Sequence, residues 1–226
     1  MPLPFIPIVI AFAVGAAAGT TAVVKWDDII YALQGKKIAV LGARAVGKTT
    51  LLKYLEKDIL IERYRQTLDR QEVERIRVKL GDLDIRLRKT NDVSGGQAAY
   101  GVWKELFDTS DLIFYIVRTD KLLKHDSATE KRCEDDLKQI QGWIKDSKTR
   151  KQFFIVGNHW SSDPEFRDLA ADQMGNYVDR FRALPVVKKM TQLAGGAATV
   201  KVALGSLETE SNANFLITRI FQQVEK

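Results

Sequence analysis

The strongest chemical signal in the chain is the octapeptide Gly42-Ala43-Arg44-Ala45-Val46-Gly47-Lys48-Thr49, which has the spacing GxxxxGK[ST]. Its glycines permit a tight loop whose backbone N–H groups point inward at phosphate oxygens. The Lys48 ammonium can reach the β and γ phosphates of a nucleotide, and the Thr49 hydroxyl can ligate Mg²⁺. The octapeptide and the following Thr50 are therefore predicted to contact a nucleotide.

Such a loop needs a strand before it and a helix after it. Residues 38–41 form a short apolar run that predicts a buried strand, and residues 49–57 have a helical pattern. A helix that begins near Lys48 also turns its positive N-terminal end toward the phosphates. Because both flanking elements are present, the pattern favours a phosphate-binding loop over a glycine turn with a solvated lysine.

A second motif, Asp92-Val93-Ser94-Gly95-Gly96-Gln97, offers groups for a metal and for a γ-phosphate. Asp92 can hold a Mg²⁺-bound water, and the Gly95 N–H can donate to the γ-phosphate. The glycines permit a loop that moves when that phosphate leaves. The motif follows two alternating segments, 73–80 and 85–89, whose Gly81-Asp82 junction predicts a β-hairpin.

The rest of the chain alternates short apolar runs with longer amphipathic ones. Strands are expected at 112–117, 153–156 and, more weakly, 199–204, and helices are expected at 97–107, 129–145, 165–184 and 212–224. This alternation predicts an α/β P-loop NTPase fold, with a mostly parallel six-stranded sheet covered by helices on both faces. Residues 36–226 would form that single domain.

At this point the sequence resembles the Ras-like small GTPases, and within them the Arf-like branch. The resemblance rests on GARAVGKT, on DVSGGQ and on Trp103 in VWKELFDTSDLIFYIV. It implies GTP and GDP as ligands and Mg²⁺ as cofactor, held by Thr49, Asp92 and a switch threonine. Thr67 is the only threonine from residue 53 to residue 89, so it is the candidate, although its basic surroundings also suit a solvent-facing helix.

The resemblance also implies slow GTP hydrolysis, in which Lys48 stabilises phosphate charge and Gln97 orients the attacking water. The family carries this glutamine four positions after the aspartate, whereas Gln97 is the fifth residue after Asp92. Two interpretations stay open: a catalytic glutamine displaced by a one-residue insertion, or an exposed first-turn residue of the next helix.

The family's guanine-reading motif, N/T-K-x-D, corresponds here to Asn158, His159, Trp160 and Ser161. His159 replaces the lysine, Ser161 stands at the carboxylate position, and Asp163 follows two residues late. Asp163 reads the base through a bulged loop, caps a helix that starts at Pro164, or does both. His159 stacks on the base or faces solvent.

The family's last motif is a loop whose backbone N–H meets the base oxygen. Its counterpart here is Gly205-Ser206-Leu207. Ser206 and Leu207 are therefore expected to contact the nucleotide.

The N-terminal segment carries no charged side chain from Met1 to Val24. A helix over residues 3–24 would span about 33 Å, against about 30 Å of bilayer hydrocarbon. Residues 1–26 are therefore predicted to be a transmembrane anchor, with a signal peptide or a soluble segment as alternatives. Trp26 would lie in the headgroup layer. Lys25, Lys36 and Lys37 follow the apolar run, which predicts that the remainder of the chain lies in the cytoplasm. Gly15 and Gly19 have the GxxxG spacing that permits a homodimer.

With that anchor, the layout is similar to the beta subunit of the signal-recognition-particle receptor and to membrane-anchored GTPase-like proteins of bacteria.

The composition and residue spacing argue against nucleic-acid binding and against a histidine or cysteine metal site. The net charge is +6, but basic residues are interspersed with acidic ones, so specific nucleic-acid binding is not expected. His125, His159 and the single cysteine, Cys133, lie in different segments and make no metal-ligand spacing. A lone thiol fits a reducing compartment. The acidic run at 134–136 is interpreted as a solvated helical face.

The sequence thus predicts a membrane-anchored GTPase-like switch that recruits a cytoplasmic partner. Two alternatives stay open. One is a nucleotide-bound scaffold that does not hydrolyse GTP. The other is an ATP-using P-loop protein in which residues 112–117 form the Walker B strand and Asp120 lies near its end.

Overall fold

The computed structural model describes residues 36–56, 97–164 and 174–224. Within them, strands β1 (Ile38–Leu41), β2 (Leu112–Arg118), β3 (Gln152–Asn158) and β4 (Val200–Leu204) form one sheet in the order β1-β2-β3-β4. Every neighbouring pair is parallel, which confirms the predicted sheet type. The hairpin expected at residues 73–89 lies outside the described residues, so four of the six expected strands are observed.

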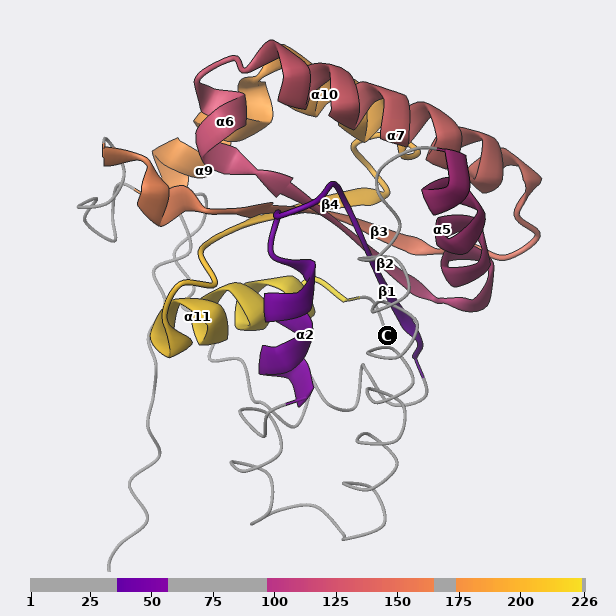
Figure 1. The fold of residues 1–226 in the computed structure, drawn as a ribbon, viewed down its shortest axis with the longest axis horizontal. Helices are drawn as coiled ribbons and strands as arrows, with labels where there is room; N and C mark the ends of the chain where they lie inside the picture. The colour runs from indigo at the N-terminus through magenta and orange to yellow at the C-terminus, as the bar shows by residue number, and fades with distance from the viewer. Residues whose placement is uncertain (1–35, 57–96, 165–173, 225–226) are drawn as a thin grey trace, which may run out of the picture.

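Helices connect and cover these strands (Figure 1). They are α2 (Lys48–Glu56), α5 (Gln97–Thr109), α6 (Thr119–Leu123), α7 (Ser127–Asp146), α9 (Met174–Ala183), α10 (Pro185–Leu193) and α11 (Glu210–Phe221), with a 3₁₀ turn η1 (Trp160–Ser162). The helices expected at 97–107, 129–145 and 212–224 are confirmed within a few residues. The sequence missed α10, because Leu184 is extended before Pro185, which then starts a new helix at its first position.

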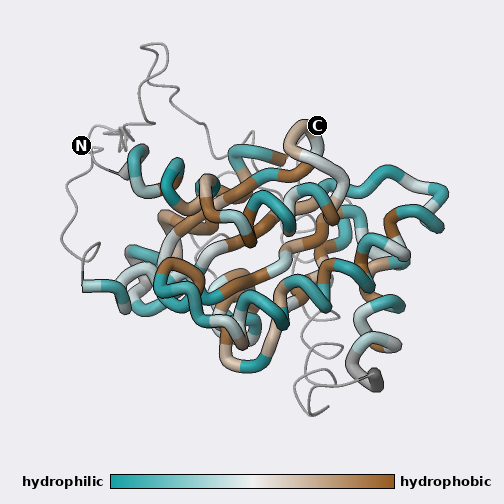
Figure 2. Tube along the Cα trace, turned by 90° about the horizontal axis from the view of Figure 1, so that it is seen from above, coloured by the Kyte–Doolittle hydropathy of each residue, from teal (hydrophilic) through white to brown (hydrophobic). Residues whose placement is uncertain are grey.

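Successive side chains of a strand point to opposite faces of the sheet. Both faces are buried because helices cover each of them. On β2, Ile113 and Tyr115 join one core with α5, α7, α9 and α10. Phe114 and Ile116 join a second core with α2 and α11 on the other face. Figure 2 shows the hydrophobic strands enclosed by more hydrophilic helices. This two-sided burial explains why β2 is a continuous apolar run in the sequence.

Parallel pairing brings the carboxyl ends of all four strands to one edge of the sheet. In register, Leu41 of β1 pairs with Tyr115 of β2, and Arg118 of β2 pairs with Asn158 of β3. The loops that follow the strands therefore gather at this edge, which is where open α/β sheets bind ligands.

None of the helices in the described ranges has the length and apolarity needed to cross a bilayer. The apolar run of residues 3–24 lies outside those ranges.

Candidate nucleotide-binding site

The predicted phosphate-binding loop joins β1 directly to α2. Gly42 and Gly47 have φ angles of 139° and 104°, in the region that favours glycine. A Cβ at Gly42 would lie 2.4 Å from the Ile116 carbonyl oxygen, and one at Gly47 would lie 2.3 Å from Asn158 Nδ2. Both motif glycines are thus required by backbone conformation and by close contacts with neighbouring strands.

Lys48 is the first residue of α2 and is only 6% exposed. Its Nζ donates to the carbonyl oxygens of Gly42, at 2.8 Å, and of Ala43, at 2.6 Å, so the ammonium is enclosed by its own loop. Burial lowers the pKa of Lys48 to about 8. An ammonium held at the helix N-terminus with little solvent is well placed to attract a phosphate group.

Asn158, the last residue of β3, connects the phosphate-binding loop to the loop after β4. It is buried, with 2% exposure. Its Nδ2 donates to the Val46 carbonyl oxygen at 2.8 Å, and its Oδ1 accepts from the Leu207 N–H at 3.0 Å. The asparagine that the sequence analysis identified as a base contact therefore also holds two loops of the site together.

His159 follows in the left-handed conformation, with φ of 65°. Its ring is half-buried, and Nε2 has no hydrogen-bond partner among the described residues. Burial lowers the pKa of His159, so the ring is mostly neutral at pH 7. The ring is therefore more enclosed than that of a solvent-facing residue, and stacking on a base stays a prediction.

Trp160 packs into the protein. Its ring stacks on Phe215 at a centroid distance of 6.2 Å and lies 6.0 Å from the Tyr177 ring. These contacts are those of core packing. They fix the start of η1 against α9 and α11.

The serine at the family's carboxylate position is hydrogen-bonded to the loop after β4. Ser161 Oγ donates to Glu208 Oε2 at 2.6 Å and lies 2.8 Å from Ser206 Oγ. Asp163 is 6% exposed, and its N–H donates to the Trp160 carbonyl oxygen at 3.0 Å, which closes η1. Pro164 is helical, as a capping role for Asp163 requires. Sequence reasoning missed Glu208, because only the fold brings it to Ser161.

Several predicted residues cannot be placed. Thr67, Asp92 and Gly95 lie outside the described residues, and Gln97 is the first residue of α5 with its side chain not described. In the part of the chain that the structure describes, no group of three or more His, Cys, Asp or Glu side chains is arranged to hold a metal ion. The Mg²⁺ ligands therefore stay predictions.

Asp120, the carboxylate of the ATP-type alternative, is engaged elsewhere. It lies in α6, where Arg118 Nε and Nη2 donate to its two oxygens at 2.8 and 2.6 Å. Burial would raise the pKa of Asp120, but the Arg118 hydrogen bonds and charge hold it below the usual value. A carboxylate whose two oxygens are both bound by arginine is a poor metal ligand.

The interpretation of residues 134–136 as a solvated face is wrong at Asp136, which has 0% exposure. Asp136 accepts hydrogen bonds from Tyr100 Oη and Tyr115 Oη, each at 2.9 Å, and pairs with Arg132 Nε at 2.9 Å. Burial raises the pKa of Asp136 despite these partners. The physical reason for the error is helical phase: Asp136 is the one residue of the run that points at α5 and β2.

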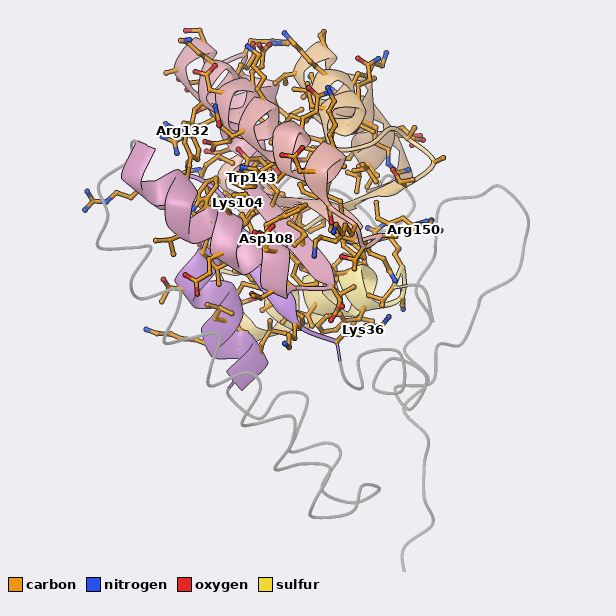
Figure 3. The ribbon with its side chains drawn as sticks, turned by 90° about the vertical axis from the view of Figure 1, so that its right-hand side faces the viewer. Lys36, Lys104, Asp108, Arg132, Trp143 and Arg150 are labelled. Carbon is orange, nitrogen blue, oxygen red and sulfur yellow. The ribbon has the colours of Figure 1, made fainter. Side chains whose placement is uncertain are left out.

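This buried carboxylate attaches the first turns of α5, the helix that follows the DVSGGQ motif, to α7. Figure 3 shows Arg132 near the N-terminal end of α5, while Trp143 lies farther along, between α5 and α7. The Trp143 ring lies 6.5 Å from the Tyr100 ring and 5.8 Å from the Phe107 ring. The N-terminal part of α5 is thus held against α7 by these contacts.

Replacing Asn158 by alanine is expected to destabilise the domain by about 1–3 kcal/mol, because the Val46 carbonyl and the Leu207 N–H would be left buried without a partner. Urea unfolding of both proteins measures the difference. Gln192→Ala, which removes an exposed amide from α10, is the control and should change stability by less than about 0.5 kcal/mol. Equal stability of Asn158→Ala and the parent would contradict the connecting role.

Comparison with known proteins agrees with this geometry. The ADP-ribosylation factor family model matches residues 27–169, more than half of the chain. That range includes the phosphate-binding loop, the DVSGGQ motif and the Asn158 loop. The search of curated protein sequences returned no match. The enclosed lysine, the parallel sheet and the family match lead to one conclusion: this chain belongs to the ADP-ribosylation factor (Arf) family of GTP-binding small GTPases.

Proposed function

We propose that the protein is a membrane-anchored switch that binds GTP and GDP with Mg²⁺, hydrolyses GTP slowly and recruits a cytoplasmic partner in one nucleotide state. The observation that carries the proposal is the Lys48 ammonium, enclosed in a strand–loop–helix that Asn158 connects to the β4 loop. A nucleotide would then bind with its phosphates at the start of α2 and its base beside the loops after β3 and β4.

For the phosphates, the backbone of residues 42–47, Lys48, Thr49 and Thr50 would supply the contacts. Thr49 would ligate Mg²⁺ together with Asp92 and Thr67, and the Gly95 N–H would donate to the γ-phosphate. The magnesium ion would bridge phosphate oxygens and neutralise their charge. Since the γ-phosphate contact involves the loop before α5, its loss on hydrolysis would release that loop.

For the base, Asn158, His159, Asp163, Ser206 and Leu207 would supply the contacts. In the structure the Leu207 N–H is used by Asn158, and the Glu208 N–H donates to Ser206 Oγ at 3.1 Å. Asp120 is neutralised by Arg118, which disfavours the ATP-type alternative. We therefore propose guanine over adenine, with discrimination weaker than the family's because Ser161 occupies the motif position and a carboxylate must reach the base from elsewhere.

Turnover would be slow. Gln97 is one position later than the family's glutamine, so it is expected to orient water poorly without help from a partner. The same displacement supports the second candidate, a GTP-bound scaffold that does not hydrolyse its nucleotide. In both versions α5 stays attached to α7 through Asp136, so that conformational change would be confined to the segment before α5.

The apolar segment 3–24 would anchor the domain, with the nucleotide site in the cytoplasm and the chain crossing the membrane once. Its 22 residues match the bilayer thickness, and all nearby lysines follow it. Gly15 and Gly19 would allow two such helices to pair.

Lys48→Ala should weaken GDP binding about ten- to a hundredfold, because it removes charge-assisted hydrogen bonds to phosphate. Calorimetric titration with GDP measures the loss. Lys53→Ala, an exposed lysine on the same helix, is the matched control and should bind like the parent. If Lys48→Ala and Lys53→Ala bind GDP equally well, the phosphate-binding assignment is wrong.

The lowered pKa of Lys48 predicts a pH dependence. A bound phosphate favours the charged amine, whereas the free protein loses that proton above a pKa of about 8. Affinity for GDP should therefore fall as pH rises from 7.5 to 9.5, approaching about tenfold per unit above the pKa. Lys48→Arg keeps its charge over this range, so its affinity should fall less steeply. Deprotonation of the guanine base of GDP affects the parent and this variant equally. Identical slopes would contradict the burial argument.

Anchoring is tested by fractionation of cells that express the full chain or a version that starts at Trp26. The full chain should stay with membranes through high salt and alkaline carbonate, because a spanning helix is held by the hydrophobic effect and not by charge. The shorter version should be released. Release of the full chain by either wash would show that residues 3–24 do not span the bilayer.

A further inference from the structure

The family's base-reading carboxylate is absent from its usual position, and the structure brings a different carboxylate to that place. Ser161 occupies the position in the loop after β3, and Glu208 reaches it from the loop after β4. The two residues are 47 positions apart, so the pairing cannot be read from either motif alone. The contact is short, with 2.6 Å between Ser161 Oγ and Glu208 Oε2.

The donors and acceptors around this contact form a closed ring. An ionised carboxylate only accepts, so the single Ser161 proton goes to Glu208. Ser206 must then donate across the 2.8 Å contact to Ser161 Oγ. Ser206 Oγ in turn accepts from the Glu208 N–H at 3.1 Å. The ring starts and ends on Glu208 and fixes the direction of its side chain.

The ring is also fixed relative to the phosphate-binding loop. Leu207, directly before Glu208, donates its N–H to Asn158, and Asn158 donates to Val46 within that loop. The Trp160 N–H donates to the Gly205 carbonyl oxygen at 3.4 Å, a second link between the β3 and β4 loops. Glu208 therefore has a defined position with respect to a nucleotide whose phosphates lie at Lys48.

The other two carboxylates near this edge are less suited to reading a base. Asp120 is held by Nε and Nη2 of Arg118, and Asp163 is 6% exposed at the end of η1. Glu208 is exposed, and its carboxylate has a second oxygen, Oε1, besides the one that accepts from Ser161. Two adjacent carboxylate oxygens match the two adjacent donors of guanine, its N1–H and its 2-amino group.

We propose that Glu208, oriented by Ser161 and Ser206, is the carboxylate that recognises guanine in this protein, in place of the family's motif aspartate. This inference rests on the proposed function, because it names the specificity-determining residue of the same site. Glu208 contacts the base, while Ser161 is a positioning residue that acts through it. The serine at the motif position is then a functional part of a relocated contact.

The test measures affinities of the full-length chain for GDP, IDP, XDP and ADP by competition. Glu208→Gln exchanges one acceptor oxygen for an NH₂ donor. It should weaken GDP binding by about ten- to a hundredfold and bring XDP, whose C2 carbonyl replaces the amino group, to equal or better affinity. Glu105→Gln, an exposed glutamate on α5, is the matched control and should keep the parent's order.

Two further variants separate Glu208 from its alternatives. Ser161→Ala should lower the ratio of GDP to IDP affinity, which reports the 2-amino contact, and leave IDP affinity within about twofold of the parent, because the phosphate contacts persist. Asp163→Asn should leave the GDP to XDP preference unchanged. If Asp163→Asn inverts that preference while Glu208→Gln does not, the base is read by Asp163 and the inference is wrong.

Two outcomes separate the role of Glu208 from guanine-nucleotide binding itself. A parent that binds GDP in a Lys48-dependent way, with unchanged base preference in Glu208→Gln, overturns only the role of Glu208. A parent that binds ADP more tightly than GDP overturns both.

Discussion

The site depends on two hydrogen bonds made by one buried side chain. Asn158 donates to the Val46 carbonyl and accepts from the Leu207 N–H, and so joins the loops after β1, β3 and β4. A buried amide that satisfies two buried backbone groups is costly to replace, because each group left alone bears its full desolvation penalty. The parallel sheet brings the three loops to one edge, and Asn158, at the end of β3, contacts both of the other loops.

Three buried charged side chains near the site each have specific partners. Lys48 is held by two carbonyl oxygens, Asp120 by two donor nitrogens of Arg118, and Asp136 by two tyrosine hydroxyls and Arg132. Of these, Lys48 is the group without a counter-ion within hydrogen-bond reach in the described residues. A phosphate would supply that missing negative charge. Burial therefore outweighs the attraction of Asp136 and lowers the pKa of this lysine.

Local sequence pattern was sufficient for the four strands that the structure describes, for most of the described helices and for the loop between β1 and α2. The apolar run of β2 and the glycines at 42 and 47 are dictated by burial and backbone conformation, which act over a few residues. Pattern failed where distant segments meet. Nothing near Asp136 indicated that two tyrosines, at positions 100 and 115, would enclose it, and nothing near Ser161 indicated Glu208. No helix was predicted after Leu184, where the expected helix of residues 165–184 ends. Pro185, which suits the first position of a helix, starts α10 there.

The central claim is that this Arf-family domain holds a guanine nucleotide between the Lys48 loop and the loops connected by Asn158. The most direct measurement is identification of the nucleotide released by heat from the purified full-length chain, followed by calorimetric titration of the emptied protein with GDP and ADP. The account predicts that GDP or GTP is released and that GDP binds more tightly than ADP. Release of adenine nucleotide, or tighter binding of ADP, would contradict it.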